Sequence, residues 1–253
     1  MFTIGNNVER FKDLKDSAEL CGLFINYLII PSWTGYDNKI TYLRDAIKNL
    51  PENDIICFID AYDVIVYGDE NDILDKFYSF KSNFVIGCEA NCFPGFAEAS
   101  FPKFHPKTIF RYLNSGNFIG YKSAVFDYVT WKSDEEIKEI CKKGSDQYYL
   151  MCYFTEFYKT KGIVLDHDQI MFQLMFGVSW YDFKIKEGRI YNSVLKTYPN
   201  VLHFNGNSQL TNKKLDIRSV FNSLIEKGDD GSGLLEFKPK FNKWGVWRPQ
   251  LQS

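Results

Sequence analysis

Two carboxylates stand where an apolar strand runs out, in the segment FIDAYD at residues 58–63. Clusters of oxygen ligands at such an edge suit Mg²⁺ or Mn²⁺, which bind carboxylates together with phosphate oxygens of a substrate. A divalent cation held there would neutralise the charge of a pyrophosphate leaving group. Aspartate is also common in the turns that end strands, so Asp60 and Asp63 alone leave a structural turn as the alternative.

His203 is the third member of a candidate metal site. It ends a second apolar strand and is followed by small polar residues at 205–207, of a kind that lets backbone N–H groups approach a phosphate. If the two strand ends face one crevice, Asp60, Asp63 and His203 form a set of two oxygen ligands and one nitrogen ligand for Mn²⁺. A purely structural histidine is the competing interpretation.

Two further polar segments are candidates for ligand contact. Small polar residues at 114–116 interrupt a strand predicted over residues 112–121, which favours either close backbone approach to a ligand or a β-bulge without function. Asp146 and Gln147 begin a predicted helix over residues 147–159, where an aspartate also stabilises the helix dipole.

The segment DHD at residues 166–168 resembles a DxD motif or a metal-binding pair of aspartates. It can equally cap the segment that follows it. We interpret these three residues as structural. The sequence contains no P-loop, no GxGxxG after its first predicted strand and no GxSxG. Nucleoside triphosphatases, dehydrogenases and serine hydrolases therefore lose support.

The composition excludes several classes of protein. The chain has 253 residues, with 30 Lys and Arg against 32 Asp and Glu, so it lacks the basic excess of a nucleic-acid-binding protein. Aromatic residues make up 17% of it, far more than a disordered chain carries. No apolar run is long enough to span a membrane. Six scattered cysteines form no CxxC motif, so a zinc ribbon is not supported.

Strand and helix signals alternate through the first 90 residues. Apolar runs at 1–5, 23–30, 54–59 and 84–88 predict strands, and residues at helical spacing predict helices between them at 8–20, 38–50 and 71–80. This order favours an α/β fold with a mostly parallel sheet covered by helices on both faces. Ligands of such sheets bind beyond the carboxyl ends of the strands.

The second half of the chain is less regular. A long aromatic-rich loop is predicted at 89–111. The strand predicted at 112–121 follows it, then a helix near 124–131 and the helix predicted at 147–159. Strands are predicted at 162–165 and 201–207, with a hairpin at 180–191. We expect a single domain over residues 1–227, then a flexible segment and C-terminal tail over 228–253.

Three segments together resemble the glycosyltransferase domain of the multifunctional procollagen lysyl hydroxylases. They are DAYDVI at 60–65, LNSGNFIG at 113–120 and HFNG at 203–206, in the order and approximate spacing of that family. The resemblance covers roughly residues 2–215. It implies a GT-A-like, Rossmann-like fold and a free-standing transferase unit, since the iron-binding motif of the hydroxylase domain is not visible.

The resemblance also implies roles for individual residues. Asp60, Asp63 and His203 would hold Mn²⁺, and Asp146 would orient or deprotonate the acceptor. The other implied catalytic residues are Gln147 and Asn114. For a bound UDP-sugar, Thr3 and Ile4 would border the uracil, Trp33 would lie near it, and Tyr62 would stack on or flank the uridine. Lys39 would approach the ribose or diphosphate, and Asn205, Gly206 and Asn207 would cradle the diphosphate. The other residues implied to bind the donor are Phe93, Ser115 and Gly116. Phe93 stands where the family has a tryptophan that gates the donor sugar.

The implied activity is transfer of glucose, favoured over galactose, from UDP-glucose or UDP-galactose to hydroxylysine or galactosyl-hydroxylysine of a collagen-like peptide. A catalytically weak module that binds UDP-sugar and collagen is the alternative. A sugar-phosphate nucleotidyltransferase is disfavoured, because GNNV at residues 5–8 matches its Gly/Arg-rich loop poorly. The family works in the endoplasmic reticulum. No signal peptide is visible, so a cytoplasmic or viral protein is compatible with the sequence, as is a homo-oligomer.

Overall fold

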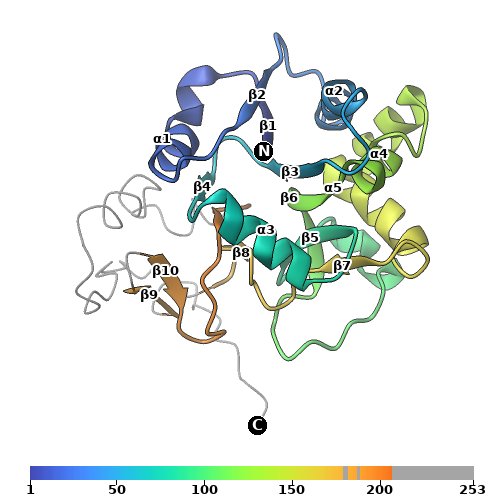
Figure 1. The fold of residues 1–253 in the computed structure, drawn as a ribbon. Helices are drawn as coiled ribbons and strands as arrows, with labels where there is room; N and C mark the ends of the chain where they lie inside the picture. Colours follow the sequence, from blue (N-terminus) through green and yellow to red (C-terminus); the bar gives the residue numbers. More distant parts are fainter. Residues whose placement is uncertain (179–181, 187–188, 207–253) are drawn as a thin grey trace, which may run out of the picture.

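The computed structural model describes residues 1–178, 182–186 and 189–206. Asn207 and the tail predicted at 228–253 lie outside the described residues. A six-stranded sheet forms the centre of the described part (Figure 1). Its strands, in spatial order, are β2 (Asn26–Ile29), β1 (Phe2–Gly5), β3 (Ile55–Ile59), β6 (Tyr112–Tyr121), β5 (Phe84–Glu89) and β7 (Ile163–Leu165).

The sheet is parallel except at β6, which runs antiparallel to β3 and β5. The predicted α/β fold with a mostly parallel sheet is confirmed. The predicted interruption at residues 114–116 falls inside β6 and coincides with a shift of register against β5, where Ile86 pairs with Phe118 and Cys88 with Leu113. The backbone N–H of Asp60 donates to the carbonyl of Gly116 (2.7 Å) and so extends the pairing of these neighbouring segments.

Helices cover both faces of the sheet. They are α1 (Lys12–Leu20), α2 (Asp37–Ile47), α3 (Glu70–Ser79), α4 (Lys122–Val129) and α5 (Asp134–Phe157), with short 3₁₀ turns η1 (Val8–Phe11) and η2 (Gly95–Ser100). Alternate side chains of a strand point to opposite faces. Accordingly, Ile56 and Phe58 of β3 join the core cluster of α2, α4 and α5, whereas Cys57 and Ile59 join that of α1 and α3.

A three-stranded sheet brings His203 beside Asp60 and Asp63, the other two residues of the candidate metal site. Its strands are β4 (Val64–Val66), β11 (Val201–His203) and β8 (Phe172–Leu174), with β11 in the middle. His203 pairs with Val64, the residue after Asp63, and the Phe204 N–H donates to the Asp63 carbonyl (2.8 Å). A hairpin of β9 (Phe183–Lys186) and β10 (Arg189–Asn192) stands at the place predicted from the sequence.

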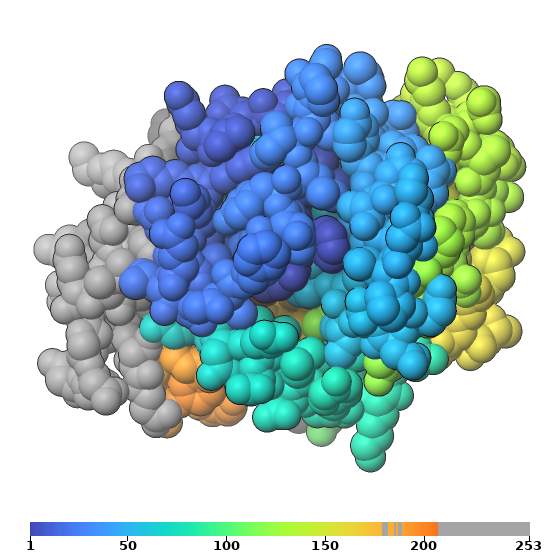
Figure 2. Space-filling model, turned by 45° about the horizontal axis from the view of Figure 1, so that its top comes forward, coloured from blue at the N-terminus to red at the C-terminus, as the bar shows by residue number. Residues whose placement is uncertain are grey.

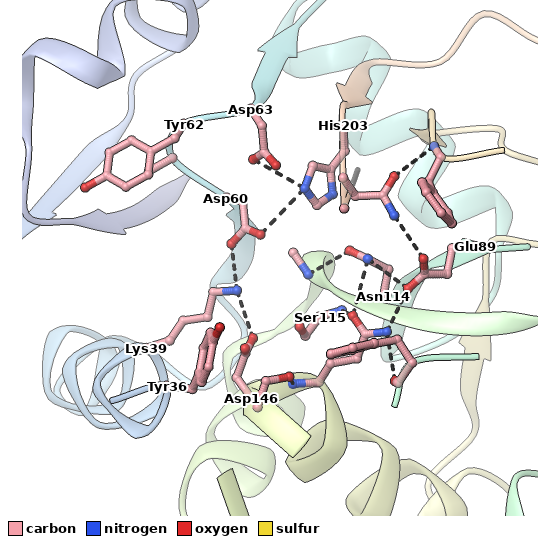
Figure 3. Close-up of a pocket in the computed structure, with 18 of the residues that line it drawn as sticks. Tyr36, Lys39, Asp60, Tyr62, Asp63, Glu89, Asn114, Ser115, Asp146 and His203 are labelled. Carbon is pink, nitrogen blue, oxygen red and sulfur yellow. Dashed lines mark hydrogen bonds and ion pairs between the residues drawn. The ribbon is translucent and has the colours of Figure 1, made fainter. Parts of the chain in front are cut away.

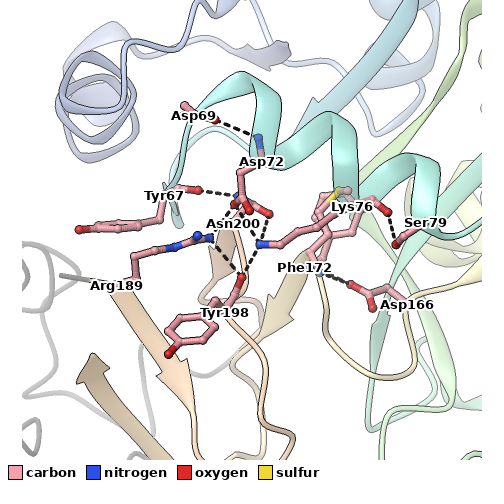
Figure 4. Close-up of polar contacts among 11 residues, drawn as sticks. Tyr67, Asp69, Asp72, Lys76, Ser79, Asp166, Phe172, Arg189, Tyr198 and Asn200 are labelled. Atoms are coloured by element: carbon pink, nitrogen blue, oxygen red, sulfur yellow. Dashed lines mark hydrogen bonds and ion pairs between the residues drawn. The ribbon is translucent and has the colours of Figure 1, made fainter. Parts of the chain in front are cut away.

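A polar cluster ties α3 to the segment that leads into β11 (Figure 4). The Asp72 carboxylate accepts from Lys76 Nζ (3.0 Å), Arg189 Nη2 (2.6 Å) and Asn200 Nδ2 (2.5 Å). Burial raises the pKa of Asp72, but hydrogen bonds from these three residues outweigh it and lower the pKa below its ordinary value. The cluster therefore fixes the strand that ends at His203.

Asp166 lies in the loop that joins β7 to β8. It is completely buried, and its two oxygens accept from the backbone N–H groups of Ile170 (2.8 Å), Met171 (2.9 Å) and Phe172 (2.8 Å). These contacts agree with the interpretation that Asp166 caps the following segment. That segment forms β8, which the sequence did not predict as a strand.

Helix α5 begins earlier than predicted and changes direction within its length. Its N-terminus at Ser133 has a capping box with Glu136. Gly144 and Ser145 have non-helical backbone angles, so the predicted helix start at Gln147 corresponds to the second half of α5. The kink sets Asp146 and Gln147 at the head of that second half.

Figure 2 shows one face of these elements in space-filling view. Blue residues from the first fifty positions lie above the teal residues of the α3 region, with green and yellow residues of α4 and α5 on the right (Figure 2). Within the part of the chain that the structure describes, no helix is long and apolar enough to cross a membrane. All six cysteines are free thiols.

Candidate functional site

A cleft of about 960 Å³ opens at one edge of the main sheet. It lies beyond the carboxyl ends of β1, β3 and β5, where ligands of such sheets bind. Because β6 is antiparallel, its early residues Asn114, Ser115 and Gly116 reach the same edge. Residues from both sheets and from α2 and α5 line the cleft (Figure 3).

Asp60, Asp63 and His203 converge on one wall of the cleft. The Nε2 atom of His203 is 3.6 Å from Asp60 Oδ2 and 3.4 Å from Asp63 Oδ1, and the three ligand atoms lie within 4.8 Å of one another. Both aspartates belong to the turn between β3 and β4, and β11 pairs with β4, so this grouping follows from the local topology. Two carboxylates and an imidazole suit Mn²⁺.

Gly116 keeps the space beside these ligands open. A Cβ atom at this position would overlap His203 Cε1 and the carboxylate of Asp60. Any other residue there would fill the region between the candidate ligands. The side chains present therefore fit a divalent cation by ligand chemistry and by available space.

His203 and Asp63 each stabilise the charged form of the other. Burial lowers the pKa of His203, but the neighbouring Asp63 carboxylate outweighs it and raises the pKa above its ordinary value. Burial raises the pKa of Asp63, but the charge and hydrogen bond of His203, together with the charge of Lys39, outweigh it and lower the pKa. A divalent cation that displaced the proton between the two side chains would bind the same imidazole and the same carboxylate.

Lys39 of α2 connects the candidate metal site to Asp146 of α5. Its Nζ atom lies 2.6 Å from Asp60 Oδ1 and 2.8 Å from Asp146 Oδ2. Burial lowers the pKa of Lys39, but the charges of Asp146 and Asp60 outweigh it, so the net pKa lies well above its ordinary value. The lysine predicted to approach the ribose or diphosphate thus holds two of the candidate functional carboxylates.

Glu89, at the end of β5, organises the floor of the cleft. Its carboxylate accepts from the side-chain amides of Asn114 (3.0 Å), Gln147 (2.7 Å) and Asn205 (2.9 Å). Burial raises the pKa of Glu89 above its ordinary value. Glu89 is not among the site residues predicted from the sequence, although an acid directly after the apolar run at residues 84–88 is a usable signal.

Gln147 extends this arrangement to the backbone. Its Oε1 accepts from the backbone N–H of Ser115 (3.3 Å), and its Nε2 donates to the carbonyl of Phe93 (3.1 Å). Asn114 Oδ1 accepts from the backbone N–H of Gly116 (2.9 Å). Several of the predicted site residues are thereby joined in a single network around Glu89.

The residues predicted around uridine are only partly placed together. Ile4, Trp33 and Tyr62 line the cleft, but Thr3 does not. The expectation that Thr3 borders the base is therefore not met by its side chain. Thr3 is completely buried within β1, and its Oγ1 atom has no hydrogen-bond partner among the described residues.

Tyr62 is held by the segment that follows β1. Its hydroxyl accepts from the backbone N–H groups of Asn6 (2.7 Å) and Asn7 (3.0 Å), and its ring stacks on Phe11. The guanidinium carbon of Arg10 lies 4.3 Å from the centre of the Tyr62 ring. The side chain is thus fixed at the cleft, with its stacking on uridine still a prediction.

The remaining predicted donor residues lie at the rim and on the β11 side. Phe93 is 55% exposed at the rim. Asn205 is buried and its Oδ1 accepts from the backbone N–H of Phe176 (3.1 Å). Gly206 also lines the cleft and has φ +59°, a conformation that favours glycine. Tyr36 and Phe176 are lining residues that no sequence pattern indicated.

Comparisons with known proteins identify the family of this chain. The profile of the family described as the PLOD GT domain matches residues 30–219. A multifunctional procollagen lysine hydroxylase and glycosyltransferase of Caenorhabditis elegans is 32% identical over 224 residues, covering 80% of this chain and 30% of that protein. An uncharacterized protein of Acanthamoeba polyphaga mimivirus is 30% identical over 181 residues, covering 70% of this chain and 37% of that protein.

The crystal structure of galactosyltransferase LgtC, in complex with donor and acceptor sugar analogues, has the same fold. The TM-score is 0.54 at 12% identity, with 89% of this chain and 94% of that chain covered. The matches span only 30% of the length of the Caenorhabditis elegans relative and 37% of the length of the mimivirus relative. The family profile nevertheless matches most of this chain, which therefore belongs to the glycosyltransferase family described as the PLOD GT domain.

Proposed function

We propose that the cleft transfers a hexose from a UDP-sugar to a hydroxyl group of hydroxylysine or galactosyl-hydroxylysine in a collagen-like peptide. Glucose is the favoured sugar and galactose the alternative. The observation that carries this proposal is the convergence of Asp60, Asp63 and His203 in a cleft that Asp146 also lines. The family, and the activity named for the Caenorhabditis elegans relative, support it.

Asp60, Asp63 and His203 would hold Mn²⁺ at the diphosphate. The bound cation would supply Lewis-acid stabilisation of the negative charge that develops on the leaving UDP. Asn205 and Gly206 line the same cleft, where backbone and amide N–H groups can bind phosphate oxygens. Preorganised donors of this kind stabilise a transition state because they need no reorganisation during the reaction.

Asp146 is the group we assign to the acceptor. It is buried and held by Lys39 at 2.8 Å, so its carboxylate has a fixed position. It would orient the acceptor hydroxyl or take its proton as the new glycosidic bond forms. The network of Glu89, Asn114 and Gln147 would fix the floor on which the donor sugar rests.

Mn²⁺-dependent release of UDP tests the proposal. UDP-glucose and UDP-galactose are offered in parallel, each with and without hydroxylysine or galactosyl-hydroxylysine peptide. Release stimulated by an acceptor with one donor supports the proposal and identifies the sugar. Folded protein that binds UDP but releases none from either donor would instead support a binding module of the same fold.

A further inference from the structure

Asn117 lies directly behind the histidine of the candidate metal site. It belongs to β6, where it pairs with Ile59, and it is completely buried. Its Nδ2 atom is 2.8 Å from Nδ1 of His203, the ring nitrogen that faces away from Asp60 and Asp63. Its Oδ1 atom is buried and has no hydrogen-bond partner in the described part of the chain.

The orientation of this amide determines which nitrogen of a neutral His203 carries the proton. With Nδ2 facing Nδ1, the amide donates and Nδ1 accepts, so the proton belongs on Nε2. That proton points toward Asp60 Oδ2 and Asp63 Oδ1. An imidazole in this form has no lone pair on Nε2 for a cation.

A cation bound between the three residues requires the opposite arrangement. The Nε2 lone pair must face the ion, and the proton must lie on Nδ1 and needs an acceptor. Turning the Asn117 amide over exchanges Oδ1 and Nδ2 while the outline of the side chain is unchanged. Oδ1, which otherwise lacks a partner among the described residues, would then accept the proton of Nδ1.

We propose that Asn117 positions His203 for metal binding, with its Oδ1 accepting the Nδ1 proton whenever a divalent cation occupies the site. This inference rests on the metal site of the proposed function. Hydrogen-bonding partners behind a metal-binding histidine fix its tautomer and the orientation of its ring. Asn117 has the burial, distance and spare acceptor atom for this role.

Two variants of similar size separate the acceptor from simple packing. Asn117→Leu keeps the volume and removes the acceptor, whereas Asn117→Asp keeps an acceptor and removes the donor. Mn²⁺ is titrated into the full chain by calorimetry without nucleotide. We expect Asn117→Leu to weaken the Kd by about tenfold or more, and Asn117→Asp to bind at least as tightly as the wild type.

The tautomer itself is measured in the wild type, which removes any dependence on the folding of a variant. The chain has three histidines, so ¹⁵N-detected proton correlation spectra resolve His203 by comparison with His203→Ala. At saturating Zn²⁺, a diamagnetic substitute, we expect a proton on Nδ1 and none on Nε2.

The outcomes distinguish this inference from the metal site on which it rests. A wild type that binds neither Mn²⁺ nor Zn²⁺ overturns both. Unchanged binding by Asn117→Leu, in a titration where His203→Ala abolishes binding, overturns the role of Asn117 alone. A proton on Nε2 of His203 in the metal-loaded protein overturns it as well.

Discussion

At the scale of single residues, the cleft depends on side chains that satisfy one another's charges. Lys39 is shared between Asp60 and Asp146, and the Glu89 carboxylate is shared among three amides. Buried polar groups are costly when a partner is removed. Single substitutions here should therefore change the chemistry of the site far more than substitutions of exposed residues.

Removing a metal ligand should abolish Mn²⁺-dependent transfer. Asp60→Ala and His203→Ala each delete one of the three candidate ligands, whereas neither residue belongs to the apolar core clusters. We expect UDP release to fall to the rate measured without Mn²⁺, with a far-ultraviolet circular dichroism spectrum like that of the wild type. Full activity in both variants would mean that the metal site is assigned incorrectly.

Glu89→Gln tests the floor of the cleft. A glutamine has one acceptor oxygen and one N–H₂ group, which would face amide donors that the carboxylate now accepts. We expect the rate of sugar transfer to fall by about 100-fold, because small displacements of positioned groups are that costly. Glu98→Gln, at an exposed carboxylate outside the cleft, is the matched control and should keep its rate.

At the scale of elements, the residues at the strand ends could be predicted from the sequence. The side chains from distant parts of the chain that contact them could not. Asp60, Asp63 and His203 each follow an apolar run, a local pattern that the sequence displays directly. The contact of Lys39 with Asp146 joins positions 107 residues apart in the chain, and no local pattern encodes it. The first half of α5 was missed despite a capping signal, Ser133 with Glu136.

The antiparallel direction of β6 could not be predicted from a local sequence pattern either. An antiparallel strand within a parallel sheet has the same apolar residues as its neighbours, so periodicity cannot reveal it. The consequence for the site is large, because this direction places Asn114, Ser115 and Gly116 at the cleft. The break that small residues make in the sequence is an irregularity in the register of β6 against β5, and these residues line the cleft.

The kink of α5 should be more stable with glycine at position 145. Ser145 has φ +74° and ψ −179°, a region that is nearly exclusive to glycine and costs other residues about 1–3 kcal/mol. We expect Ser145→Gly to raise the free energy of unfolding, measured in urea, by about 1 kcal/mol. Ser145→Ala is the control: both variants lose the bond from Gln147 N–H to Ser145 Oγ, but only alanine keeps the strain, so it should be less stable than Ser145→Gly. A less stable glycine variant would contradict the assignment of strain.

At the scale of the whole molecule, the site is assembled from two sheets. The larger sheet supplies Glu89 and Asn114, the turn after its strand β3 supplies Asp60, and the smaller sheet supplies His203. Two buried or half-buried acids, Asp72 and Asp166, connect them, the first through α3 and the second through the loop between β7 and β8. The geometry of the metal site thus depends on contacts far from it.

The pH dependence of stability should report the burial of Asp166. Burial raises the pKa of Asp166 from 3.8 to about 6, because it outweighs the backbone N–H donors of Phe172, Ile170 and Met171. The native state therefore binds this proton more readily than the unfolded state, and its contribution to stability is lost as pH rises through about 6. An asparagine side chain at this position does not titrate, so we compare the wild type with Asp166→Asn.

Urea unfolding of the two proteins between pH 4 and pH 7 measures this contribution. We expect the free energy of unfolding of the wild type, relative to Asp166→Asn, to increase as pH falls from 7 to 4. Asp72, whose pKa is lowered, titrates in both proteins, so its opposite effect cancels in the difference. Parallel curves for the two proteins would show that Asp166 titrates alike in the folded and unfolded states, and that the loop joining the sheets is open to water.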